Sequence, residues 1–155
     1  MAPTKGWYGS LQLGEAGGPL FGNFNFVRGQ VEVRGYRSLP RIAQRDPRLI
    51  IAARVGGGII VPYGTGPKAS VPFAERLYLG GGTTVRGWGA NRLGPSVTTT
   101  DTTEPAASAH ATILVPAGGL FDTLGNLELR KFLFAGISMA AFTDVGRVWP
   151  TLSPL

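Results

Sequence analysis

Hydrophobic and polar residues alternate along several stretches of this chain. The alternation is clearest in residues 24–36, where valines take one side and charged or amide residues the other: Val27, Val31 and Val33 against Arg28, Gln30, Glu32 and Arg34. A period of two is typical of a β-strand with one apolar and one wet face. The same pattern predicts further strands at 7–15, 49–61, 125–133 and 136–149.

The length of these segments bears on where the strands lie. They run for about nine to thirteen residues, near the roughly 9–11 that a tilted membrane strand needs. Strands of soluble proteins are most often about 5–6 residues long. The pattern therefore favours an all-β, antiparallel transmembrane barrel.

The connections between the predicted strands differ in length. Residues 62–72 are rich in turn formers, 75–95 are glycine-rich, and 96–118 are polar and low in complexity. We expect 75–95 to be a structured loop and 96–118 to be a long exposed one. Long loops at one end and short turns at the other are typical of outer-membrane barrels.

Composition supports one all-β domain over residues 1–155. The 24 glycines, 12 prolines and only 15% charged residues describe a chain that is neither helical nor disordered. Cysteine is absent and His110 is the single histidine, so we expect no disulfide and no metal site. No run approaches the roughly 18 apolar residues of a membrane helix.

The net charge of +6 and the pI near 10.3 leave three explanations open. They fit nucleic acid, a lipid head-group surface or an arginine-rich barrel interior. The basic residues are spread singly, and no aromatic RNA-binding motif accompanies them. We therefore expect no nucleic-acid partner.

Three short motifs carry the strongest signal. The first is Val85-Arg86-Gly87-Trp88 within the glycine-rich segment; the others are Asn-Leu-Glu-Leu-Arg at 126–130 and Phe-Thr-Asp-Val-Gly at 142–146. In this order they resemble the outer-membrane protein-insertase superfamily, the BamA and TamA kind of bacterial surface antigen barrel. Trp88 stands where phenylalanine or tyrosine is usual, and Thr143 where a valine-like residue is common.

The resemblance implies a fold and a site. The fold would be a barrel of about sixteen strands, of which this chain supplies five or six. The glycine-rich segment would fold back into the lumen, where Arg86 at the tip meets Glu128 and Asp144 on the wall. A guanidinium has five donors in a planar fork, which suits such carboxylates, and we expect Gly80, Gly81, Gly82 and Gly87 to supply positive φ and close approach to the wall.

Plainer interpretations stay open for these residues. Arg86 could be a solvated loop arginine, and Glu128 and Asp144 could be the ordinary charges of a polar inner face. A catalytic carboxylate pair lacks supporting pocket aromatics or a second acid cluster, so we expect no catalytic residues and no enzyme. Trp7 and Trp149 are candidates for an interfacial aromatic girdle.

The resemblance also implies a function for the whole protein. It would insert other barrel proteins into the outer membrane of a bacterium or organelle, or export secreted chains, and it would need no cofactor. Its partners would be outer-membrane lipid, unfolded clients, and the barrel strands and periplasmic domains that this sequence does not show, so we expect the chain to be a section of a larger protein that is inactive alone. The alternatives are a non-insertase barrel, serving as a passive pore or as the anchor of a secreted protein, and a soluble all-β binding module.

Overall fold

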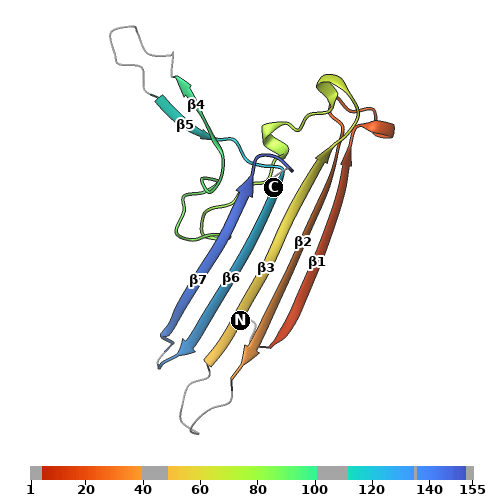
Figure 1. Cartoon of the computed structure of the whole chain (residues 1–155). Helices are drawn as coiled ribbons and strands as arrows, with labels where there is room; N and C mark the ends of the chain where they lie inside the picture. Colours follow the sequence, from red (N-terminus) through yellow and green to blue (C-terminus); the bar gives the residue numbers. More distant parts are fainter. Residues whose placement is uncertain (1–4, 40–48, 101–111, 135, 153–155) are drawn as a thin grey trace.

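The computed structural model describes residues 5–39, 49–100, 112–134 and 136–152. Five long strands form one antiparallel sheet: β1 (Gly6–Ala16), β2 (Phe26–Ser38), β3 (Leu49–Pro62), β6 (Phe121–Phe132) and β7 (Ser138–Trp149). Their order in the sheet is β1-β2-β3-β6-β7, so β6 pairs with β3 across the long connection (Figure 1). The all-β, antiparallel fold predicted from the alternation is confirmed.

The observed strands lie close to the predicted ones, and the largest shift is at β6. This strand begins at Phe121, four residues before the predicted start at 125, because Phe121 to Leu124 pair with Ile59 to Gly56 of β3.

The segment predicted as one long exposed loop, 96–118, contains paired strands. Residues Ser96–Thr100 (β4) and Thr112–Pro116 (β5) form an antiparallel two-stranded ribbon. Figure 1 shows this ribbon projecting away from the sheet. The threonines that make the segment look like a polar loop are β-branched and well suited to extended backbone.

Strand register places even-numbered residues on one face of the sheet and odd-numbered residues on the other. One cross-strand row on the even face runs Arg34, Arg54, Asn126 and Asp144. The odd face, called the outward face below, is apolar and exposed at its centre; examples are Leu11, Val31, Val55, Leu127 and Val145. The even face is called the inward face.

The long connection between β3 and β6 packs on the inward face. Short 3-10 helices at Gly66–Lys68 (η2) and Phe73–Glu75 (η3) begin it, and Gly18–Leu20 (η1) lies between β1 and β2. Two clusters of buried side chains fill the space between connection and sheet: Phe26, Ile60, Val71 and Leu77, and then Leu79, Val85, Leu124 and Val148. The core of the molecule thus lies between the loop and the sheet.

Among the described residues, no helix is both long and apolar enough to span a membrane.

Candidate functional site

The tip of the glycine-rich loop is a compact turn held by its own backbone. The amide of Trp88 donates to the carbonyl of Val85 at 3.1 Å, and the amide of Gly81 donates to the carbonyl of Trp88 at 2.9 Å. The hydroxyl of Thr84 accepts a hydrogen bond from the amide of Gly80 at 2.8 Å. These bonds close the turn and leave Arg86 at its apex.

Glycines shape this turn at two of the expected positions. Gly80 and Gly81 have φ of 109° and 95°, and a Cβ on Gly80 would lie 2.4 Å from the carbonyl oxygen of Gly89. Gly82 and Gly87 do not have positive φ, and a Cβ on either would meet nothing within 4 Å. The expectation of positive φ and close approach therefore fails at Gly82 and Gly87, because the turn needs that backbone only where it doubles back on itself.

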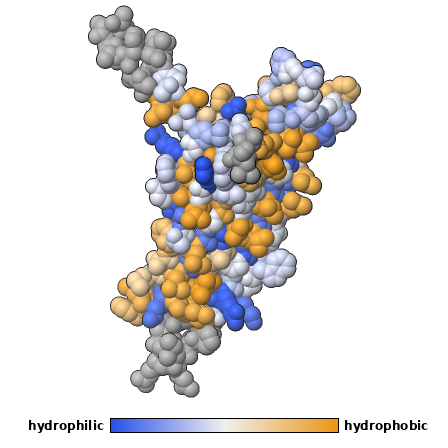
Figure 2. Space-filling model, viewed as in Figure 1, coloured by the Kyte–Doolittle hydropathy of each residue, from blue (hydrophilic) through white to orange (hydrophobic). Residues whose placement is uncertain are grey.

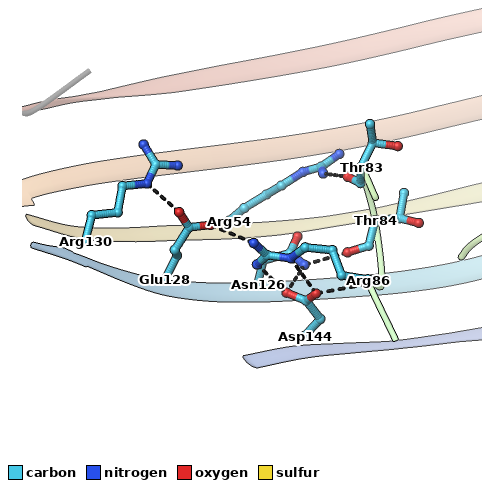
Figure 3. A network of polar contacts seen from close by, with 8 residues as sticks. All are labelled: Arg54, Thr83, Thr84, Arg86, Asn126, Glu128, Arg130 and Asp144. Carbon is cyan, nitrogen blue, oxygen red and sulfur yellow. Dashed lines mark hydrogen bonds and ion pairs between the residues drawn. The ribbon is translucent and has the colours of Figure 1, made fainter. Parts of the chain in front are cut away.

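Arg86 joins the loop to two strands of the sheet. Its Nε and Nη2 donate to the two carboxylate oxygens of Asp144 on β7, each at 2.8 Å, and its Nη1 donates to Glu128 on β6 at 2.8 Å (Figure 3). Its backbone amide also donates to Asp144, at 3.0 Å. The structure thus brings together the three residues that the resemblance singled out.

The arginine is enclosed by more than its carboxylates. The Cζ of Arg86 lies 3.6 Å from the ring centroid of Phe142 on β7, which is a cation–π contact. The Asp144 side chain is only 4% exposed and that of Glu128 17% exposed. The hydrogen bonds that Arg86 donates to Asp144, and then to Glu128, raise the pKa of Arg86 above its usual range, so this side chain stays charged at any working pH.

Residues that the motifs did not assign extend the network. Asn126 donates to the carbonyl of Thr84 at 2.6 Å and to Asp144 at 2.8 Å, and Arg130 donates to Glu128 at 2.5 Å. Arg54 on β3 donates to the carbonyl of Thr83 at 2.5 Å (Figure 3). The sequence feature that could have identified Arg54, Asn126 and Arg130 is their even numbering, which puts them on the same sheet face as Glu128.

One glutamate bonds both of the arginines that face each other on the inward face. Arg34 and Arg54 lie directly opposite each other on β2 and β3. Glu32 accepts from the Nε of each, at 2.5 Å and 2.6 Å. Like charges facing each other across strands are destabilising, and the shared carboxylate offsets that repulsion.

An apolar contact beside Arg86 explains the glycine of the third motif. Val85 is buried against Leu79, Leu124 and Val148. A Cβ on Gly146 would lie 2.8 Å from the Cγ2 of Val85 and 3.0 Å from the Cδ1 of Leu79. Gly146 therefore leaves room for the loop to reach the sheet.

A second ion pair holds the other part of the connection. Arg28 on β2 donates to both the carbonyl and the carboxylate of Glu75 in η3, the latter at 2.8 Å. These side chains are 28% and 48% exposed. The connection is thus attached to the sheet at two separate places, through Arg28 on β2 and through Arg86, whose partners lie on β6 and β7.

The two girdle candidates lie at opposite ends of the sheet, both on the outward face. Trp7 near the start of β1 is 82% exposed. Trp149 at the end of β7 packs against Phe121 with ring centroids 4.9 Å apart. Trp88 in the loop is 52% exposed.

The described part of the chain offers little support for a metal site. It contains no cluster of three or more histidine, cysteine, aspartate or glutamate side chains able to hold a metal, and His110 lies outside it. A polar groove of about 710 Å³ runs between the loop and β1–β3, lined by residues such as Gln12, Gln30 and Tyr78. The site as described holds a loop against a sheet.

Comparison with known proteins identifies the family of this site. The profile of the Omp85 superfamily domain matches residues 1–154. The chain belongs to the Omp85 superfamily. The resemblance in the motifs is thereby confirmed, and membership indicates a β-barrel setting, an outer-membrane location and a family role in outer-membrane protein assembly or translocation.

A relative of this Omp85 domain is the outer membrane protein assembly factor BamA of Nitratidesulfovibrio vulgaris. The two are 31% identical over 93 residues, which is 60% of this chain and 11% of the relative. The chain therefore spans a small part of the relative's length.

Proposed function

We propose that the protein containing this domain inserts β-barrel proteins into the outer membrane or moves secreted chains across it. Two findings support the proposal: the superfamily match over nearly the whole chain, and a relative named as an assembly factor. In this proposal unpaired strand edges elsewhere in the barrel pair with clients by β-augmentation. The process needs neither a catalytic residue nor a cofactor.

The contact of Arg86 with Asp144 and Glu128 is the observation that carries the proposed mechanism. The loop would brace the wall from the lumen, because one guanidinium bonds carboxylates on two neighbouring strands. Such a brace keeps this section of wall in register while another part of the barrel opens. Gly80, Gly81 and Val85 would serve it by shaping and seating the tip.

A disulfide between loop and wall tests the brace directly. The chain has no cysteine of its own, and the Cγ2 of Val85 lies 2.8 Å from where a Cβ on residue 146 would be. The side chains of residues 85 and 146 would therefore touch, as a disulfide requires, and Val85→Cys removes one of the two methyl groups that crowd residue 146. The pair Val85→Cys with Gly146→Cys, in the intact protein, should cross-link under mild oxidation, whereas Val85→Cys with Val145→Cys, whose residue 145 faces outward, should not.

Activity is tested in cells that depend on the intact protein. Depletion should lower the amounts of other outer-membrane barrel proteins, and the wild-type gene should restore them. Unchanged amounts of other barrels would contradict the insertase proposal and favour a passive pore or the anchor of a secreted protein. A cross-link of equal yield in both cysteine pairs would contradict the brace.

A further inference from the structure

Charged residues on the outward face lie only near the ends of the sheet. Among the described strand positions of this face they are Glu15, Arg37, Lys131 and Arg147. Glu15 and Arg147 lie toward the end that carries the long connection. Arg37, near the end of β2, and Lys131, beside the short turn between β6 and β7, lie at the opposite end.

The register places Arg37 and Lys131 close together. Arg37 is level with Ile51 on β3 and Leu129 on β6, and Lys131 follows two residues later on β6. Two strand spacings of about 4.8 Å and a rise of about 3.4 Å per residue separate the two Cα atoms by about 12 Å. Both long side chains can reach one small anion between them, above the apolar side chains of Leu49 and Ile51.

These two cations differ from the basic residues of the inward face. Arg28, Arg34, Arg54, Arg86 and Arg130 each form an ion pair with a carboxylate. Neither Arg37 nor Lys131 forms an ion pair with any residue that the structure describes. Their positive charges therefore face outward without a described partner.

The neighbouring side chains are apolar and exposed. Met139 on the outward face is 59% exposed and Phe134, just after β6, is 72% exposed, and Trp7 lies at the same end of the sheet. Figure 2 shows hydrophobic residues beside strongly hydrophilic ones at this end. Exposed aromatic and basic side chains at the edge of an apolar band are typical of the boundary between lipid tails and head groups.

We propose that Arg37 and Lys131 bind the phosphate of an anionic glycerophospholipid, in which no head-group ammonium offsets the phosphate charge, and that its acyl chains lie over Leu49, Ile51 and Leu129. This inference rests on the proposed membrane setting. The end with short turns is the periplasmic end of an outer-membrane barrel, so the ligand would come from the inner leaflet. Each cation near an anionic lipid surface is expected to tighten binding about fivefold, and the pair about 25-fold.

Lipid titration of the intact protein in detergent tests the site. Bound phosphatidylglycerol and phosphatidylcholine are counted by native mass spectrometry. Wild-type protein should bind the first about 25-fold more tightly, the double variant Arg37→Gln with Lys131→Gln should lose this preference, and Lys131→Gln alone should lose about fivefold. The matched control Arg147→Gln, at the other end of the same face, should keep it.

A heat-shift gel establishes that each variant is folded before titration. An unchanged preference in the folded double variant would overturn the proposal, and so would an equal loss in Arg147→Gln, because general attraction to a basic protein would then explain it. Neither of these two results would change the outcome of the depletion experiment, which tests the proposed insertase function separately. Conversely, a lipid preference that depends on Arg37 and Lys131 would stand even if that depletion had no effect on other barrels.

Discussion

At the scale of single residues, the site depends on properties that only arginine has. Three guanidinium nitrogens of Arg86 bond two carboxylates while its flat face covers the ring of Phe142. Lysine has a point charge without the planar fork, so it cannot make the same set of contacts. Asp144 is nearly buried, and the loss of its cation would leave a carboxylate without its main partner.

We expect Arg86→Ala to destabilise the intact barrel by at most about 3–5 kcal/mol, the range for a buried pair that loses one partner. Water in the lumen would reduce the loss. Arg86→Lys should fall between wild type and alanine, because it keeps the charge and loses the bidentate bond. The midpoint of unfolding in denaturant measures both; a lysine variant as stable as wild type would contradict the role given to the fork.

Gly146→Ala should also loosen the loop, although it removes no polar contact. Its Cβ would lie 2.8 Å from the Cγ2 of Val85, and such overpacking typically costs about 1–3 kcal/mol. Gly14→Ala is the matched control, because a Cβ there would meet nothing within 4 Å. Proteolysis of the loop compares the two, and equal protection in both variants would speak against the packing of Val85 on Gly146.

At the scale of elements, the connection between β3 and β6 is a strap across four neighbouring strands. Arg28 on β2, Arg54 on β3, Asn126 on β6 and Asp144 on β7 each bond a different part of it. The attachments differ in exposure: Glu75 is about half exposed, whereas Asp144 is 4% exposed. Exposed ion pairs contribute about 0–1 kcal/mol, so among the polar attachments those at the tip hold the strap most firmly.

Hydrogen exchange should reveal this difference along the strap. We expect the amides of residues 73–76 to exchange faster than those of 80–88, because the exposed Arg28–Glu75 pair holds that stretch and local opening begins where attachments are weakest. Glu75→Gln should speed exchange only in the first region, whereas Asp144→Asn should speed it at the tip. Equal exchange in both regions of the wild-type protein would show that the strap opens as one unit.

At the scale of the whole molecule, the sheet has one polar and one apolar face. The inward face carries the ion pairs and the loop, and the outward face is apolar between its charged ends. β1 and β7 are the edge strands of this sheet, and an open edge cannot be satisfied in lipid. The arrangement suits one section of a closed wall.

A charge should be tolerated on one face of β2 and rejected on the other. Val31→Arg places a cation at the centre of the outward face, where it should cost about 2–4 kcal/mol in a bilayer. Gln30→Arg, one residue away, points into the polar groove and should cost far less. Folding of the intact protein into lipid vesicles compares them; equal losses would contradict the assignment of the faces.

The sequence by itself determined the strands, their two faces and, through the family resemblance of three motifs, the three central residues of the arginine site, Arg86, Glu128 and Asp144. These features are local, because alternation with a period of two and short motifs are visible within about ten residues. The same locality explains the misses. The true start of β6 is set by its pairing with β3, and the ribbon in 96–118 is set by the pairing of β4 with β5. The backbone angles at Gly82 and Gly87 are set by how the loop tip folds.

Only the tertiary structure decided which groups meet. Arg28 reaches Glu75 across 47 positions, and Asn126 and Arg54 hold carbonyls of the loop. Such contacts depend on the register of four strands and on where the loop crosses them, and no local pattern encodes either. The sequence could place Arg86, Glu128 and Asp144 on facing surfaces, but the distances that join them come from the packing of Val85 over Gly146 and the turn closed by Gly80 and Gly81.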